Sequence, residues 1–301
     1  MIKSTKAFFS HSKLYSRPGR MFSDVAKLNY LSFLNDSAPA SFVVAHGLMG
    51  NSLNFRPIVT HQELSSLCNS YLFDLRNHGK SEHKPTMSLE DMACDIEAAT
   101  QKLGLEKFYL LGHSLGGKVA MVYSRLFPQR LKGLIVCDVG PYDYNDVTKF
   151  KAGAKTQEML QTCAKIPMKG LSRQELWAKI ESAANNSKSV AGLLMSNIDE
   201  VGKNEFKWKV NLDVINIFYN ELLGIYRGTS KKYSGPVKVI AGRQSEYVPR
   251  NELSEFHSVF ENFDTQRDIV YIEGANHWVH FTKPEEFVKE VSSFIKQRER
   301  L

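Results

Sequence analysis

A serine between two glycines carries the strongest chemical signal in this chain of 301 residues. Ser114 lies in Gly112-His-Ser-Leu-Gly116, a G-x-S-x-G pattern that follows an apolar run and precedes a helical one. In that context the serine occupies a strained turn at the end of a sheet, and side chains in place of the two glycines would collide with neighbouring backbone. The pattern predicts a nucleophilic serine at a helix N-terminus, where developing negative charge is stabilised.

A serine hydroxyl is a weak nucleophile at neutral pH and needs a general base. Of the nine histidines, His277 alone lies in a Gly-rich loop between the last strand candidate and the C-terminal helix candidate, in Gly274-Ala-Asn-His277-Trp. This position suits a chain order in which the histidine follows the serine. His46, His78 and His113 fall inside turn motifs, where we expect structural roles. We therefore predict His277 as the base.

Two carboxylates compete for the role of orienting His277 through its second ring nitrogen. Asp138 ends a strand candidate in Val136-Cys-Asp-Val-Gly-Pro141, and Glu246 lies in the later loop Gly242-Arg-Gln-Ser-Glu-Tyr247. We favour Asp138, because a carboxylate at the carboxyl end of a strand reaches such a site most directly. Glu246 stays open as the alternative acid.

A second turn with two glycines, His46-Gly-Leu-Met-Gly50, follows the first strong strand candidate. Its glycines permit a tight turn that leaves one backbone N–H free. We expect the N–H of Leu48 to pair with that of Leu115, the residue after the serine. Two donors aimed at one point would form an oxyanion hole for a tetrahedral intermediate.

The elements that must position these residues are short apolar runs alternating with longer amphipathic ones. Near-continuous apolar strands are typical of a parallel sheet that is covered on both faces. Alternation of such strands with helices predicts an α/β fold with a doubly wound, mostly parallel sheet. The strand candidates are residues 41–45, 70–74, 108–112, 131–138, 237–241 and 268–272, and the clearest helix candidates are 88–103, 116–126 and 284–295.

The alternation stops between residues 142 and 234, where helical patterns occur without a convincing strand. The clearest of these patterns cover residues 171–183 and 206–226. We interpret the segment 142–234 as a helical insertion over the strand ends. Insertions at this position can act as lids that exclude water from a site.

The chain has a net charge of +7 and an isoelectric point near 9.1, and most of its excess of basic residues lies near the N-terminus. Residues 1–30 hold six basic residues and one acid, together with five serines, while the remaining residues are nearly balanced. A basic, Ser-rich and acid-poor start is typical of a mitochondrial transit peptide, which we place at 1–27. We expect no nucleic-acid partner, because the rest of the chain shows no basic stripe. No apolar run is long enough for a transmembrane helix.

These residues together resemble the α/β-hydrolase superfamily, from about Leu28 to the C-terminus. Four segments, 112–118, 138–141, 208–213 and 242–248, resemble a narrower branch of small-acyl esterases. This branch includes mitochondrial α/β-hydrolase-domain esterases and the fungal ethanol acetyltransferases. The resemblance implies Ser114 as nucleophile, Asp138 as acid and His277 as base. Ser245, at the position where many relatives carry the acid, is consistent with this branch.

The resemblance implies acyl transfer from short acyl esters and acyl-CoA thioesters. The acceptor would be a small alcohol, as in the formation of ethyl acetate from ethanol and acetyl-CoA, or water. We expect acetyl-CoA as a possible substrate and no cofactor. We also expect no metal, because His277 and His280 lie three residues apart but the sequence offers no third ligand beside them. The alternatives are a mitochondrial carboxylesterase without transferase activity and a non-catalytic hydrolase-fold protein that binds a partner.

Overall fold

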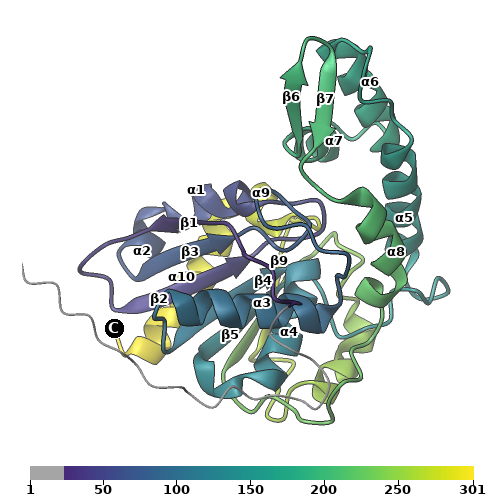
Figure 1. Cartoon of the computed structure of the whole chain (residues 1–301). Helices are drawn as coiled ribbons and strands as arrows, with labels where there is room; N and C mark the ends of the chain where they lie inside the picture. The colour runs from purple at the N-terminus through teal and green to yellow at the C-terminus, as the bar shows by residue number, and fades with distance from the viewer. Residues whose placement is uncertain (1–23) are drawn as a thin grey trace, which may run out of the picture.

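The computed structural model describes residues 24–301. Six parallel strands of its main sheet lie where continuous apolar runs predict them, in the order β3-β2-β4-β5-β8-β9 (Figure 1). Because these strands are parallel, their carboxyl ends meet at one edge of the sheet. The strands are β2 (Ala40–Ala45), β3 (Cys68–Phe73), β4 (Phe108–His113), β5 (Leu131–Cys137), β8 (Val237–Gly242) and β9 (Ile269–Ile272).

A seventh strand, β1 (Tyr30–Phe33), pairs antiparallel with β3 at the edge of the sheet and was not predicted. Its four residues alternate between exposed and half-buried positions. A strand this short, with one face in solvent, carries no continuous apolar run, which explains why the sequence pattern did not reveal it.

Alternate residues of the central strands pack into two separate apolar layers. Val43 of β2 packs in the layer with α3 and α4, whereas its neighbours Phe42 and Val44 pack in the layer with α2 and α10. This division is the doubly wound arrangement that the sequence predicts. The helices are α1 (Arg56–Val59), α2 (Gln62–Ser65), α3 (Leu89–Lys102), α4 (Leu115–Leu126), α9 (Val279–Thr282) and α10 (Pro284–Glu299), with 3-10 turns η2 (Ser52–Phe55), η3 (Pro128–Arg130) and η4 (Arg250–Ser258).

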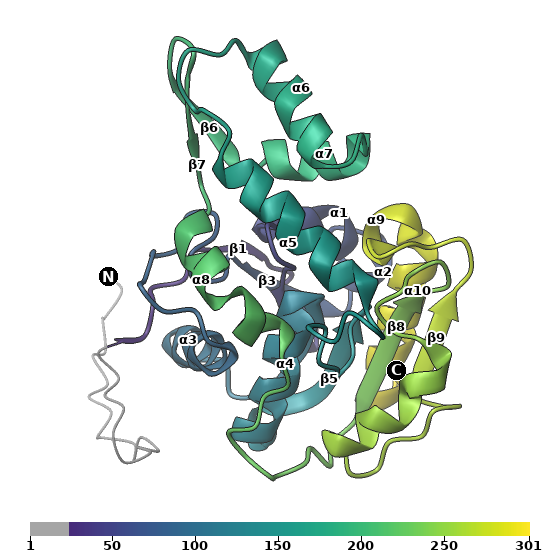
Figure 2. The same cartoon turned by 90° about the vertical axis from the view of Figure 1, so that its right-hand side faces the viewer.

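The insertion projects beyond the carboxyl edge of the sheet, with α6, α7 and a hairpin farthest from it (Figures 1 and 2). In Figure 2, α5 and α8 lie closer to the sheet than α6 and α7. The elements of the insertion are α5 (Lys151–Ala164), α6 (Arg173–Ala183), α7 (Lys188–Met195), β6 (Ile198–Gly202), β7 (Glu205–Trp208) and α8 (Leu212–Leu223).

The expectation of an insertion without strands was wrong, because β6 and β7 form an antiparallel hairpin. The helix predicted over 206–226 begins only at Leu212, and its first residues belong to β7. Four charged residues in these two short strands removed the apolar pattern that identifies a strand. Asn204 makes the turn with a φ of 54°, a conformation that asparagine tolerates better than most residues.

The predicted transit peptide, 1–27, lies almost entirely outside the described residues, and its prediction therefore stays untested. Within residues 24–301, none of the helices has the length and apolar character needed to cross a bilayer.

Candidate active site

Ser114 lies in a tight turn between β4 and α4, with backbone angles of φ 53° and ψ −118°. Positive φ is rare for a non-glycine residue, and such strain is typical of functional turns. The flanking glycines make the turn possible: a Cβ on Gly112 would lie 2.1 Å from the Gly116 carbonyl oxygen, and one on Gly116 would lie 2.3 Å from that of Ala45. The predicted collision of side chains at both positions is confirmed.

Three side chains from separate loops form one hydrogen-bonded chain at the carboxyl edge of the sheet. His277 Nε2 lies 3.1 Å from Ser114 Oγ, and His277 Nδ1 lies 2.7 Å from Asp138 Oδ2. Asp138 is fully buried at the end of β5, whereas the His277 side chain keeps 15% of its surface exposed. A buried acceptor on one ring nitrogen and a hydroxyl on the other is the arrangement that lets a histidine take a proton from serine.

The carboxylate of Asp138 has further donors besides His277. The Gly242 N–H donates to Oδ1 at 2.7 Å, and the Ser245 hydroxyl donates to Oδ2. Because the carboxylate oxygens of Asp138 accept hydrogen bonds, His277 Nδ1 is the ring nitrogen that carries the hydrogen. His277 Nε2 is then the nitrogen that is free to accept a proton. Glu246 lines the nearby cavity, and among residues 24–301 no hydrogen bond joins it to His277. The structure thus brings Asp138, rather than Glu246, to the histidine.

Tyr247 packs directly against His277 and was not singled out from the sequence. The two rings stack with centroids 3.9 Å apart at 21°. The Tyr247 hydroxyl also lies 3.4 Å from Thr156 Oγ1, which belongs to α5 of the insertion. The tyrosine therefore links the histidine to the insertion, a contact between distant segments for which the sequence carries no local signal.

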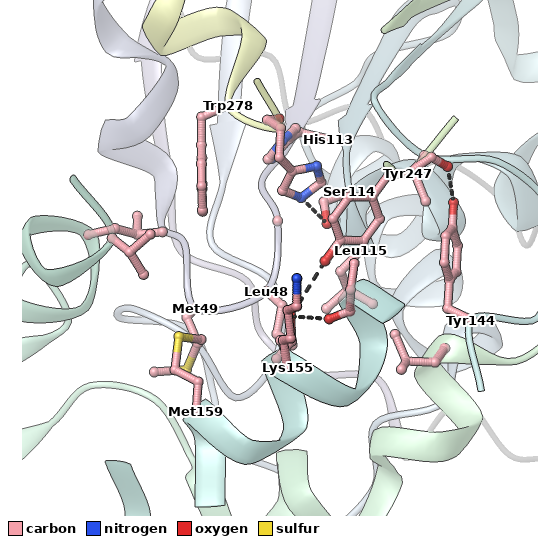
Figure 3. A pocket seen from close by; sticks show the side chains of 18 of the residues that line it. Leu48, Met49, His113, Ser114, Leu115, Tyr144, Lys155, Met159, Tyr247 and Trp278 are labelled. Carbon is pink, nitrogen blue, oxygen red and sulfur yellow. Dashed lines mark hydrogen bonds between the residues drawn. The ribbon is translucent and has the colours of Figure 1, made fainter. Parts of the chain in front are cut away.

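Leu48 and Leu115, the predicted donors of the oxyanion hole, line the same cavity as Ser114. Leu115 is the first residue of α4, so no carbonyl of that helix can accept its N–H. The Leu48 N–H makes no hydrogen bond within the described part of the chain. Figure 3 shows both residues close to Ser114. Their free donors fit the predicted oxyanion hole.

The turn that carries Leu48 is fixed by histidines on both sides. His46 Nε2 accepts the Leu75 N–H at 3.0 Å, and His78 Nε2 accepts the Met49 N–H at 3.2 Å. His113 Nε2 donates to the carbonyl oxygen of His277 at 2.9 Å. Burial lowers the pKa of all three histidines, that of His78 to about 3. They remain neutral at physiological pH and act as structural hydrogen-bonding groups.

A cavity of about 280 Å³ opens above Ser114. Its lining combines the two turns of the sheet edge with mostly apolar side chains from α5, α7 and α8 of the insertion. In Figure 3, Met159 and Lys155 of α5 reach it from the side opposite Ser114. A small apolar space above a serine suits the acyl part of an ester better than a highly charged ligand.

Three buried residues near His277 could together hold a metal ion. The ligand atoms of His113, Cys137 and His280 lie within 4.8 Å of one another. Burial raises the pKa of the Cys137 thiol well above its usual value, which opposes the thiolate form that binds metals. His280 stacks on Phe55 with centroids 4.1 Å apart, as a packed core residue would. The absence of a metal and of a cofactor stays a prediction.

Comparisons with known proteins place the chain among hydrolases. Residues 40–284 match a family model described as alpha/beta hydrolase fold. The chain is 30% identical to the sn-1-specific diacylglycerol lipase ABHD11 of Danio rerio over 87% of this chain and 79% of the relative. It is 26% identical to a probable alcohol acetyltransferase of Saccharomyces cerevisiae, over 99% of this chain and 90% of that relative. The solved structure of a marine microorganism esterase superposes with a TM-score of 0.81 and 27% identity. The match covers 89% of this chain and 99% of the esterase.

Proposed function

Because this chain belongs to the α/β-hydrolase fold family, we propose that it transfers short acyl groups from esters and acyl-CoA thioesters through an acyl-enzyme on Ser114. The observation that carries the proposal is the hydrogen-bonded chain Ser114–His277–Asp138 at the base of a small apolar cavity. Ester hydrolysis is the activity shared by the relatives that are named esterases or lipases.

In the first half of the proposed reaction, His277 Nε2 takes the Ser114 proton as Oγ attacks the acyl carbonyl carbon. The carbonyl oxygen becomes an oxyanion that accepts the N–H groups of Leu48 and Leu115. The intermediate then collapses and breaks the bond to the alkoxide or thiolate, which takes the proton from His277. The acyl group is left as an ester of Ser114, and Asp138 stabilises the transient imidazolium.

In the second half, water or an alcohol enters and gives its proton to His277 while its oxygen attacks the acyl-enzyme. The same oxyanion hole serves again, and Ser114 leaves with the proton from His277. Water yields the free acid and an alcohol yields a new ester. The two outcomes use the same catalytic residues, so the acceptor depends on the cavity and on how well the insertion excludes water.

Transfer to ethanol is the second candidate, and the yeast relative described as a probable alcohol acetyltransferase supports it. The cavity volume of about 280 Å³ lies at the lower edge of the usual range for ligand pockets, roughly 300–1,000 Å³, which favours a small ligand. A short acyl group such as acetyl is therefore our preferred substrate, although several relatives carry the name of a diacylglycerol lipase.

The test supplies the full chain with acetyl-CoA, with and without ethanol, and measures acetate and ethyl acetate together. Ethyl acetate as the main product supports transfer, and acetate alone supports hydrolysis. Ser114→Ala should abolish both products, since losing a triad nucleophile costs about a millionfold in turnover. Retained turnover in this variant would show that Ser114 is not the nucleophile.

A fluorophosphonate probe separates an enzyme from a non-catalytic binding protein, because only an activated serine reacts with it. We expect labelling of the native chain at Ser114 and none in Ser114→Ala.

We also propose that residues 1–27 direct the chain to mitochondria, on the basis of their basic, Ser-rich composition. A fluorescent fusion that lacks these residues should lose mitochondrial targeting. Unchanged localisation would contradict the proposal.

A further inference from the structure

Lys118 is a buried cation that the proposed reaction does not use. It lies on α4, one turn after the nucleophile, and its backbone N–H donates to the Ser114 carbonyl oxygen at 3.1 Å. Only 5% of its surface is exposed. The base of this side chain is thus fixed to the turn that carries Ser114.

The ammonium group of Lys118 joins the two ends of the insertion. Nζ donates to the Tyr142 carbonyl at 2.9 Å, where the chain leaves the sheet, and to the Leu223 carbonyl at 2.6 Å, at the end of α8. The same Leu223 carbonyl accepts the Tyr144 N–H at 3.1 Å. Lysine is well suited to this position, because the last carbonyls of a helix lack partners and carry partial negative charge.

The charge of Lys118 is held at a cost. Its partners are two carbonyl groups and the Tyr144 ring, whose centroid lies 4.9 Å from Nζ, rather than a carboxylate. Desolvation lowers the pKa of Lys118 to about 7, and the more distant Asp143 only partly opposes this. Burying an amine without a counter-ion is unfavourable, so an apolar residue would serve better if packing were its only task.

Lys118 also lies between two cavities. It lines the cavity above Ser114 together with Tyr219, Leu222 and Leu223, and it lines a second cavity of about 300 Å³ bordered by Met121 and Tyr226. Lys118 is therefore a residue that the linings of both cavities share. An apolar chain that reached its side chain would meet a buried ammonium, which is an unfavourable contact.

We propose that Lys118 holds both ends of the insertion against the nucleophile helix and thereby limits the length of the acyl chain that the catalytic cavity accepts. This inference rests on the proposed ester chemistry of Ser114. In it, Lys118 is a positioning and specificity-determining residue and takes no part in proton transfer.

The test compares p-nitrophenyl acetate, butyrate and octanoate, which share one leaving group, on the full chain. Lys118→Met keeps the side-chain length but removes the donors and the charge. We expect the ratio of kcat/KM for octanoate to that for butyrate to rise about tenfold, a typical effect of one altered pocket contact. Deuterium exchange should also increase in segments 142–150 and 219–226. Lys118→Arg, which keeps charge and donors, should stay within about twofold of the native ratio.

Lys132→Met is the matched control, because Lys132 pairs with Glu299 away from the cavity and should leave the ratio unchanged. If Lys118→Met does not fold, Lys118→Gln, which keeps an N–H donor, is measured in its place and should also raise the ratio. An unchanged ratio in a folded neutral variant would overturn the inference. The inference would also be overturned if that neutral variant lost fluorophosphonate labelling of Ser114 while its KM for the esters stayed unchanged. Lys118 would then act on the reaction rather than on the choice of acyl chain. Failure of the native chain to label would instead overturn the proposed function.

Discussion

The sheet edge and the insertion meet at one cavity but are built in different ways. At the sheet edge, buried backbone turns place Ser114 and Asp138, and a Cβ on either Gly112 or Gly116 would collide with neighbouring backbone. The insertion presents side chains to the cavity from helices whose opposite faces lie in solvent, and Ile217 of α8 keeps 76% of its surface exposed. Under the proposed function, this difference assigns the reaction to the sheet edge and the choice of ester to the insertion.

After the loss of Ser114 itself, the largest expected effect lies in the hydrogen bond between Asp138 at the sheet edge and His277. Asp138→Asn should lower kcat by about a thousandfold or more, because an amide favours the wrong tautomer of the histidine. Glu246→Gln, on the cavity wall, should change kcat by no more than about threefold, since no hydrogen bond to His277 is lost. Steady-state kinetics on both variants decides between the two acids. A larger fall in Glu246→Gln would reverse the assignment.

A pair of glycines tests the difference in rigidity. A Cβ on Gly116 would lie 2.3 Å from the Ala45 carbonyl, so Gly116→Ala should lower the free energy of unfolding by about 3 kcal/mol. A Cβ on Gly192, within α7 of the insertion, would have no atom within 4 Å. Gly192→Ala should therefore stabilise the protein, by up to about 1 kcal/mol, through helix propensity. Urea denaturation measures both, and a destabilised Gly192→Ala would show a constraint on the insertion that the structure does not reveal.

The acid sensitivity of the fold should arise at the sheet edge, since none of the nine histidines lies in segment 142–234. Burial, with a smaller contribution from His277, lowers the pKa of His280 to about 3. Between about pH 3 and 6.5 the unfolded chain therefore binds more protons at this site than the folded chain does. The free energy of unfolding is therefore highest, with respect to His280, above about pH 6.5, and it falls as the pH drops from about 6.5 toward 3.

His280→Phe should reduce this pH dependence, and the contribution removed is about 2 kcal/mol at pH 5. The comparison is between the slopes of unfolding free energy against pH for the native chain and the variant. Equal slopes would show that His280 does not take up a proton on unfolding.

The sequence predicts the sheet edge better than the insertion for a physical reason. The turn at Ser114 is specified by adjacent residues, and the strands before it are continuous apolar runs. The position of Asp138 follows from its place at a strand end, although its Ser245 contact appears only in three dimensions. The hairpin β6–β7 and the stacking of Tyr247 on His277 depend on exposed or distant segments. Patterns within a short window cannot specify such contacts.

A smaller expected effect on kcat than that of Asp138 concerns a contact that crosses between the two regions. Asn197, fully buried at the end of α7, donates to the Met49 carbonyl at 2.5 Å and accepts from Asn51 Nδ2 at 3.4 Å. Met49 follows Leu48 directly and has a φ of 57°, a strained conformation. The insertion therefore helps to hold the turn that carries Leu48, whose N–H would bind the oxyanion in the proposed reaction.

Asn197→Ala should lower kcat by about tenfold, less than the loss of an oxyanion donor itself, because the turn is loosened and the donor is kept. The fall should be the same for butyrate and octanoate esters, since both pass through an oxyanion at the same place. This distinguishes Asn197 from Lys118, whose replacement changes the ratio between them. Asn216→Ala is the matched control, because among residues 24–301 the Asn216 side chain bonds only within α8, to the Leu212 carbonyl. A change in KM alone would place Asn197 with the specificity-determining residues of the insertion rather than with the reaction.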